Sequence, residues 1–394
     1  MTDHVQQTPR DDVTARDEGS ASDESHAARG ESEAADEPEV SWFSALCDDD
    51  YEFLGQPDPL LASSFEHCRN IVLAADRYGF DNVLLPSGYQ LGIDNTAFCA
   101  AMAPVTSLRM LLAVRCGELV VPQLARQLAT IDQMMDGRLT VNIISSDLPG
   151  EKLDSEPRYR RSIEVMHVLR ELLDGKAVDF HGDFLDVEVD PPRVRTVSGS
   201  SPLFYFGGLS PAARECAAAG ADVFLMWPDT TDKVLDVKAD MDARAEAKGR
   251  HLRYGWRSHV IVRETEEAAR EAARRLLSRL DDDTGAAIRQ RSLDSTSAGV
   301  ARQAALRDEA DDEGYAERHL WTGVGRARSG AGAAIVGDPD QVLAKLNELS
   351  DAGIEAFILS GYPHAAECDL FARHVLPHIE HGPLQFTPDP VNPN

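Results

Sequence analysis

The chain has 394 residues, of which 67 are Asp or Glu and 39 are Lys or Arg, so its formal net charge at pH 7 is −28. A hydrophobic content of 43 % is typical of a globular protein, and the acidic balance disfavours nucleic acid and anionic membranes as partners. The six cysteines form no C-x-x-C pair, and no apolar run is long enough to span a membrane. We therefore expect a cytoplasmic protein without a disulfide framework, a bound metal or a membrane segment.

The first 40 residues contain 12 acidic side chains and no Leu, Ile, Phe, Trp or Tyr. Such a segment cannot bury enough apolar surface to offset the entropy of ordering its backbone. We predict a disordered acidic tail over residues 1–40, one large domain over residues 41–382, and an extended C-terminal tail over residues 383–394.

Eight short apolar runs follow the tail, and each has the composition of a strand that is buried on both faces. In chain order they are Trp42–Leu46, Val83–Leu85, Met110–Arg115, Leu139–Ile144, Leu203–Phe206, Val223–Trp227, Arg257–Val262 and Ala356–Leu359. Helical patterns separate the runs, so the sequence predicts an α/β fold, a TIM (β/α)8 barrel. A doubly wound open sheet is the alternative, and the lack of Gly-x-Gly-x-x-Gly after the first run counts against it.

About 90 residues separate the seventh and eighth runs, which is more than one helix and two loops require. Thr265, followed by two glutamates, predicts the start of one helix, and Asp338-Pro339 predicts the start of the last helix of this stretch. Between them the sequence is polar and rich in Ser and Gly from Asp283 to Gly332. We predict an insertion between strands 7 and 8, which is either a lid over the barrel or a plain surface excursion.

The fifth run is followed by residues that suit an anion. Gly207 and Gly208 let the backbone approach a ligand closely, and Ser210-Pro211 predicts the capped start of a helix. Free amides at a helix N-terminus, together with its dipole, bind phosphate groups without a lysine. The segment predicts a phosphate site, and an ordinary tight strand-to-helix turn is the alternative.

Two strands carry residues suited to acid–base work and anion binding. Arg257 and His259 are two apart on the seventh strand, so both side chains point to the same face, which is the interior in a barrel. A structural arginine there needs a carboxylate partner, whereas a functional one binds an anion. Tyr362 follows the eighth strand, at the end where barrel enzymes keep their catalytic groups, although a buried tyrosine that closes the barrel is the alternative.

Three further features are weaker on their own. Trp227 either walls a pocket or belongs to the core. Arg326 and Arg328 lie between glycines in the insertion, where an arginine on a closing loop can clamp an anionic substrate, although loop arginines are usually solvated. The run 48–50 is three adjacent aspartates, for which we predict a solvated loop without metal.

In combination, several separated segments resemble the flavin-dependent alkanesulfonate monooxygenases of the bacterial luciferase-like superfamily. The matching segments are Trp227 and residues 257–265, 320–325, 330–332 and 359–364. The resemblance implies a TIM barrel with an insertion after the seventh strand. It also implies a two-component enzyme, in which a separate NAD(P)H-dependent reductase supplies reduced FMN. This chain would use the reduced FMN with dioxygen to convert a small alkanesulfonate to an aldehyde and sulfite.

The resemblance also implies roles for individual residues. The FMN phosphate would lie at Gly207, Gly208, Leu209 and Ser210, with Tyr159 reaching it, and Asn142 and Ser145 would face the flavin ring. Catalysis would fall to Arg257, His259, Arg328 and Tyr362, in a pocket that Cys47 and Trp227 help to shape for the substrate. The family assembles as dimers or tetramers, so a homo-oligomer is implied as well.

Two departures from the family pattern lie on the substrate side. Cys47 stands where the family commonly has a histidine, and residues 89–92 replace a segment with an arginine and a cysteine. The same flavin oxygenase chemistry on another substrate, such as a sulfone or a biosynthetic intermediate, is therefore an alternative. A deazaflavin-dependent oxidoreductase and a flavin-binding protein without turnover are two others.

Overall fold

The computed structural model describes residues 37–89, 92–151, 153–290 and 297–385. Residues 1–36 of the predicted acidic tail (1–40) and residues 386–394 of the predicted C-terminal tail (383–394) lie outside the described residues. Strand β1 (Glu39–Phe43) begins two residues before the expected start of the domain at residue 41.

Eight parallel strands form a closed barrel, as the sequence predicted. They are β1, β2 (Asn82–Leu85), β3 (Arg109–Arg115), β4 (Leu139–Ile144), β7 (Phe204–Phe206), β8 (Val223–Met226), β9 (Arg253–Val262) and β13 (Ala356–Ser360). The pairing runs β9-β13-β1-β2-β3-β4-β7-β8, and β8 pairs again with β9, which closes the ring. The fold is thus an α/β TIM barrel, and the open-sheet alternative is wrong.

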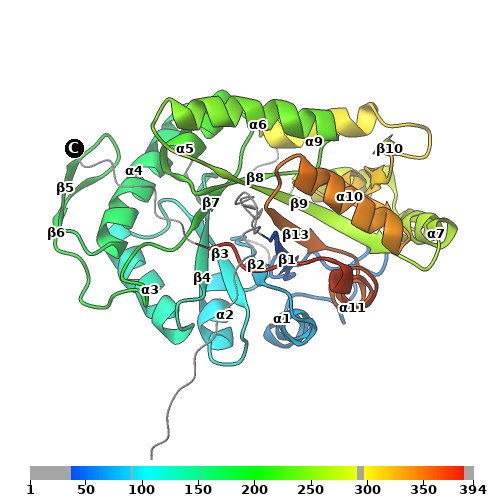
Figure 1. Cartoon of the computed structure of the whole chain (residues 1–394), viewed down its shortest axis with the longest axis horizontal. Coiled ribbons are helices and arrows are strands. Elements are labelled where there is room, and N and C mark those ends of the chain that lie inside the picture. Colours follow the sequence, from blue (N-terminus) through cyan, green and yellow to red (C-terminus); the bar gives the residue numbers. More distant parts are fainter. Residues whose placement is uncertain (1–36, 90–91, 152, 291–296, 386–394) are drawn as a thin grey trace, which may run out of the picture. The chain divides into compact units, whose positions relative to one another are not determined.

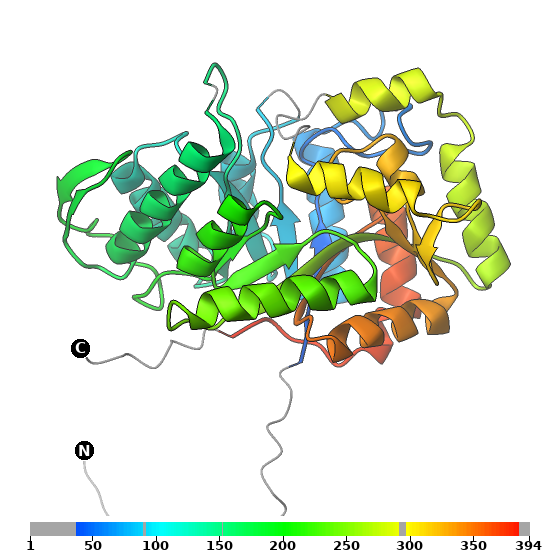
Figure 2. The same ribbon diagram turned by 90° about the horizontal axis from the view of Figure 1, so that it is seen from above.

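Helices surround the barrel (Figures 1 and 2). They are α1 (Phe65–Tyr78), α2 (Asn95–Met102), α3 (Val121–Met134), α4 (Ser155–Leu173), α5 (Pro211–Gly220), α6 (Thr231–Glu246), α10 (Pro339–Asp351) and α11 (His364–His374), with the short η2 (Leu376–His378) after the last. A small hairpin of β5 (Val178–His181) and β6 (Asp186–Val189) follows α4. Gly79 ends α1 in the left-handed conformation, with φ of 78°, which is the role its position in the sequence predicted.

The insertion between strands β9 and β13 is more ordered than its composition suggested. It contains α7 (Glu266–Leu277), α8 (Asp282–Gln290), α9 (Ala298–Asp308), β10 (Tyr315–Glu317), β11 (Leu320–Trp321), η1 (Gly323–Arg326) and β12 (Ala334–Gly337) before α10. Thr265 caps α7 as predicted, and Asp338 caps α10 in a capping box with Gln341. Strand β12 pairs in parallel with the far half of β9, where Ala334 faces His259. The insertion therefore extends the barrel sheet beyond its rim.

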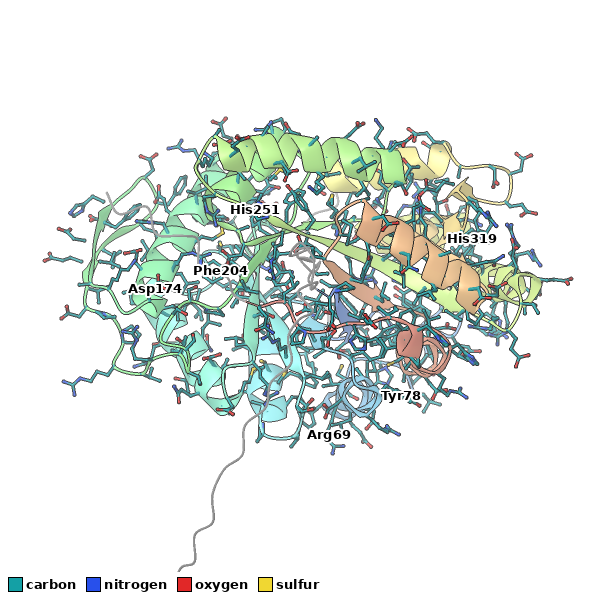
Figure 3. All side chains as sticks on the ribbon, in the orientation of Figure 1. Arg69, Tyr78, Asp174, Phe204, His251 and His319 are labelled. Atoms are coloured by element: carbon teal, nitrogen blue, oxygen red, sulfur yellow. The ribbon has the colours of Figure 1, made fainter. Side chains whose placement is uncertain are left out.

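Buried side chains fill the barrel, so the ring of strands is not a pore. Phe43, Leu111, Tyr205 and Ile358 are among the buried interior residues. Phe204, labelled in Figure 3, alternates with them and packs in the core between strands and helices.

A polar network closes the amino end of the barrel. The fully buried Glu39 accepts hydrogen bonds from Tyr205 at 2.9 Å and from Asn82 at 3.2 Å. Leu384 enters the same interior, where its N–H donates to Glu39 at 3.3 Å and its carbonyl accepts from Arg109 at 2.5 Å. Burial raises the pKa of Glu39 above its ordinary value. Residues 383–385, which we assigned to the extended tail, thus include a residue that belongs to the barrel core.

In the part of the chain that the structure describes, no helix combines the length and the apolar character that a membrane span needs.

Leu384→Ala is expected to lower the free energy of unfolding by about 2 to 4 kcal/mol, because it leaves a cavity at the amino end of the barrel. Leu60→Ala is the matched control, since Leu60 is 85 % exposed, and it is expected to change the free energy by less than about 0.5 kcal/mol. Urea unfolding measures both. Equal small effects would show that the C-terminal segment does not contribute to the core.

Candidate active site

Four predicted catalytic residues meet at the carboxyl end of the barrel. Arg257 and His259 lie on β9, Tyr362 follows β13, and Arg328 follows η1 in the insertion. Arg328 Nη1 donates to the Tyr362 hydroxyl at 2.7 Å, and the rings of His259 and Tyr362 stack with centroids 5.0 Å apart. The guanidinium carbons of Arg257 and Arg328 lie 4.4 and 5.5 Å from the ring centre of Phe43. The fold therefore gathers these side chains from three separate segments.

Arg257 is buried without a carboxylate partner. Its side chain donates to the Ser360 hydroxyl at 2.8 Å and to the Ser258 carbonyl, and no ion pair to Arg257 occurs in the described part of the chain. Burial, assisted by the charge of Arg328, lowers the pKa of Arg257 to about 9. The carboxylate that a purely structural arginine would require is missing, which favours an anion-binding role.

The prediction of a solvated loop for residues 48–50 was wrong, because two of the three aspartates serve the site. Asp49 forms an ion pair with Arg328, and only Asp48 is exposed. Burial opposes the charge of Arg328, but Tyr362 and Asp49 outweigh it and raise the pKa of Arg328 above its ordinary value. The arginine is thus held as a cation next to Tyr362.

Asp50 lies deeper and joins two histidines. Its carboxylate lies 2.9 Å from His67 Nε2 and 3.0 Å from His364 Nδ1, and it accepts the backbone N–H of His364 at 2.9 Å. Burial alone would raise the pKa of Asp50, but the charge and hydrogen bonds of the histidines lower it well below its usual range. Among the described residues, no group of three or more His, Cys, Asp or Glu is arranged to hold a metal ion.

His259 and Tyr362 are both held in their neutral forms. Both ring nitrogens of His259 lack a hydrogen-bond partner among the described residues, and the side chain is buried. Burial, followed by the charges of Arg257 and Arg328, lowers the pKa of His259 well below its ordinary value, so the imidazole is neutral. Burial raises the pKa of Tyr362, so its hydroxyl stays protonated and can donate a hydrogen bond.

The predicted phosphate site has the geometry of a cradle. A Cβ at Gly207 would lie 2.5 Å from the Leu225 carbonyl oxygen, and one at Gly208 would lie 2.6 Å from Ala213 and 3.5 Å from the Tyr159 hydroxyl. Ser210 caps α5 by accepting the Ala213 N–H at 3.2 Å, and Leu209 lies between the glycines and this cap. A cavity of about 480 Å³ opens at this helix start and is lined by Tyr159 and Ser210.

The remaining predicted residues lie near the same end of the barrel. Asn142, half-buried on β4, pairs with Tyr205 of β7, and Ser145, just after β4, donates to the Arg158 carbonyl at 3.3 Å. Cys47 is partly exposed, and burial together with Asp49 raises the pKa of its thiol to about 12, so it is no nucleophile. Trp227 is partly exposed rather than a core residue.

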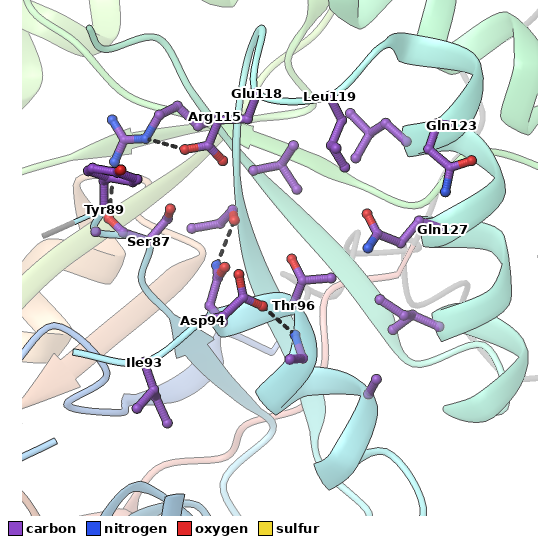
Figure 4. Close-up of a pocket in the computed structure, with 18 of the residues that line it drawn as sticks. Ser87, Tyr89, Ile93, Asp94, Thr96, Arg115, Glu118, Leu119, Gln123 and Gln127 are labelled. Atoms are coloured by element: carbon purple, nitrogen blue, oxygen red, sulfur yellow. Dashed lines mark hydrogen bonds and ion pairs between the residues drawn. The ribbon is translucent and has the colours of Figure 1, made fainter. Parts of the chain in front are cut away.

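A second cavity, of about 1040 Å³, lies at the carboxyl ends of β2 and β3 against α2 and α3 (Figure 4). Its lining includes Ser87, Asp94 and Gln127, together with Arg115, whose Nε lies 3.2 Å from a Glu118 carboxylate oxygen. None of the four predicted catalytic residues lines it. The sequence analysis did not single out Arg115, although its position as the last residue of a predicted strand places it at the carboxyl end of the barrel.

Comparisons with known proteins place the chain among monooxygenases. A family model described as luciferase-like monooxygenase matches residues 52–356. A sulfoquinovose monooxygenase of Novosphingobium aromaticivorans is 62 % identical over 356 residues, which cover 88 % of this chain and 98 % of the relative. One of Agrobacterium fabrum is 52 % identical over 349 residues, which cover 88 % and 90 %.

Solved structures share the fold at low sequence identity. DmoA from Hyphomicrobium sulfonivorans has a TM-score of 0.71 at 18 % identity, with 89 % of this chain and 90 % of that chain covered. Long-chain alkane monooxygenase has a TM-score of 0.69 at 16 % identity, with 89 % and 94 % covered. These two similarities establish the barrel architecture only.

Asp50→Asn is expected to lower the free energy of unfolding at pH 7 by about 3 kcal/mol, because it removes a buried charge from two imidazoles. The folded pKa of Asp50 is depressed, so this contribution is complete above about pH 4 and is lost as the pH falls further. Urea unfolding at several pH values measures it. Asp48→Asn, at an exposed position with φ of 53° that asparagine tolerates, is the control, and an equal effect of both variants would contradict the assignment.

Proposed function

Because the chain belongs to the luciferase-like monooxygenase family, we propose that it is the oxygenase of a two-component system. It takes reduced FMN from a separate NAD(P)H-dependent reductase and uses dioxygen to desulfonate a sulfonated sugar, with sulfite and an aldehyde as products. The observation that carries the proposal is the buried, unpaired guanidinium of Arg257 beside Arg328.

The substrate proposal refines the expectation from sequence. We expected small alkanesulfonates, whereas relatives at 62 % and 52 % identity are named sulfoquinovose monooxygenases. Sulfoquinovose is a hexose whose terminal carbon carries a sulfonate, so it keeps the anionic group and adds hydroxyls. The resemblance assigns Cys47 and residues 89–92 to the substrate side of the pocket, and residues 90 and 91 lie outside the described part of the chain. The departures from the family pattern at these positions favour a substrate other than a plain alkyl chain.

The sulfonate binds to the two arginines. A sulfonate stays ionised throughout the range of pH in which proteins are folded, and guanidinium groups give it charge-assisted, partly bidentate hydrogen bonds. Arg257 has unsatisfied charge, and Arg328 is held in place by Asp49 and the Tyr362 hydroxyl. Phe43 lies beneath both guanidinium groups and keeps water from them on that side.

Reduced FMN fits the carboxyl end of the barrel. The glycine cradle at Gly207 and Gly208 suits its phosphate, the N-terminus of α5 supplies the positive dipole, and Tyr159 and Ser210 lie at the cavity there. Asn142 and Ser145 lie at the end of the neighbouring strand β4, where they would face the flavin ring. When bound, reduced FMN supplies the activation of dioxygen. The deazaflavin alternative keeps only fold-level support, from structures at 16 % and 18 % identity.

The side chains of this chain supply orientation and proton handling. An anion bound between Arg257 and Arg328 offsets the two charges that lower the pKa of His259, so a ring nitrogen of the neutral imidazole can then accept a proton. Tyr362 donates its hydroxyl proton, or a hydrogen bond, to an oxygen that gains negative charge, and Arg257 stabilises the same charge. Burial of all three side chains excludes water from the reacting atoms. A homo-oligomer and a cytoplasmic location remain predictions of the sequence.

The function is tested by sulfite release. The purified chain is supplied with an NADPH-dependent flavin reductase, FMN and dioxygen, and is offered sulfoquinovose, ethanesulfonate and octanesulfonate. We expect stoichiometric sulfite with a kcat/KM for sulfoquinovose at least about tenfold above that for either alkanesulfonate. Preference for an alkanesulfonate would reject the sugar, and absence of sulfite from all three would reject the desulfonation.

Arg328→Ala is expected to lower kcat/KM more than about tenfold, because a charged hydrogen bond in a desolvated site is worth about 1.5 to 3 kcal/mol. Arg326→Ala is the matched control on the same loop, since Arg326 is paired with the exposed Asp282. Steady-state sulfite assays compare the two. Unchanged turnover in Arg328→Ala would remove this residue from the site.

A further inference from the structure

Helix α9 lies between two loops that carry site residues. One loop, residues 227–230, follows β8 and begins with Trp227, and the other, residues 325–332, carries Arg328. The loop with Arg328 is closed at its base, where the Gly325 N–H donates to the Gly332 carbonyl at 2.7 Å. A Cβ on Gly332 would lie 3.0 Å from the Gly325 Cα, so the two backbones meet in a narrow neck that suits glycine.

Two residues of α9 form hydrogen bonds to the neck, which consists of Gly325 and Gly332, from one side. The Gln303 side-chain oxygen accepts the Gly332 N–H at 2.9 Å, and Arg307 Nη1 donates to the Gly325 carbonyl at 3.0 Å. They are four residues apart, so they lie on the same face of the helix. Each therefore holds one strand of the neck.

Helix α9 also ties the neck to the barrel. The Gln303 amide nitrogen donates to the Pro228 carbonyl at 2.6 Å, and Arg302 forms a two-pronged ion pair with Asp229 at 2.6 and 2.7 Å. Further along, the Trp227 ring lies against the backbone of Gly299, where a Cβ would come within 2.7 Å of it. Gln303 thus links the end of β8 directly to the loop of Arg328.

We propose that Gln303 and Arg307 are positioning residues that fix Arg328 relative to Trp227 before substrate arrives. The insertion then acts at this point as a rigid bracket, and not as a free lid. That this arrangement helps Arg328 to bind a sulfonate rests on the proposed function. That Gln303 and Arg307 hold the loop 325–332 in place does not.

Of the two positioning residues, Gln303 is expected to matter more for holding the loop, because it is buried. Gln303 is 7 % exposed, and losing its amide leaves a buried N–H and a buried carbonyl without partners. The neck then opens more often, and the Arg328 loop samples conformations away from the site. A nearly isosteric methionine keeps the packing and removes both hydrogen bonds.

The loop contains a built-in reporter, because trypsin cleaves after Arg326 and Arg328. The experiment compares the wild-type chain, Gln303→Met, Arg307→Met and Gln341→Met under native conditions, with cleavage at these two sites followed by mass spectrometry. Gln341 is the matched control, since it also accepts a backbone N–H and donates to another group, but in the cap of α10. KM and kcat for sulfoquinovose are measured on the same samples.

We expect Gln303→Met and Arg307→Met to speed cleavage in the loop at least about tenfold and to raise KM more than they lower kcat. Gln341→Met is expected to change neither, even if it lowers the melting temperature as much. Cleavage as slow in Gln303→Met and Arg307→Met as in Gln341→Met would overturn the inference. An inactive wild-type enzyme would reject the proposed function, while the cleavage rates would still decide whether α9 fixes the loop.

Discussion

A guanidinium buried beside a second guanidinium is the constraint around which the carboxyl end of this barrel is organised. Arg257 is 3 % exposed and carries no ion pair in the described residues, and it shares the Phe43 ring with Arg328. Burying a cation without a counter-ion costs free energy unless another contact offsets it. Part of that cost is offset by the hydrogen bond to the Ser360 hydroxyl and by the contact with the Phe43 ring, and the stability of the rest of the fold covers the remainder. The site is therefore preorganised for an anion that the chain itself does not provide.

The two acidic residues near this centre, Asp49 and Asp50, have different partners. Asp49 balances Arg328 and leaves Arg257 without an ion pair, so the site keeps an excess of positive charge, which is where we propose that the sulfonate binds. Asp50 holds His364 beneath Tyr362, whose ring lies 5.2 Å from that of His364. Two positive neighbours also keep His259 neutral. One distribution of charge thus sets both the affinity for an anion and the proton preference of the groups beside it.

Local patterns predicted the barrel and singled out several residues that the structure brings together. Apolar runs and the period of two placed Arg257 and His259 on one inward face, and the capping residues after β7 marked the glycine cradle, because such signals lie within a few residues of each other. The pairing of Asp49 with Arg328 joins positions 279 residues apart, so nothing local distinguished the aspartate run from a solvated loop. Helices α8 and α9 were missed because their polar composition hides the apolar period, and the place of Leu384 in the barrel depends on a contact with Glu39.

The most direct test of this account is calorimetric titration of sulfoquinovose, and of glucose as the uncharged counterpart, into the FMN-loaded wild-type chain and Arg257→Met. The account predicts that the sulfonated sugar binds the wild type at least about 100-fold more tightly than glucose, the factor expected from two charged hydrogen bonds, and that Arg257→Met removes most of this difference. Equal affinity for both sugars, or a preference that survives in Arg257→Met, would contradict the claim that the unpaired arginine is the anion site.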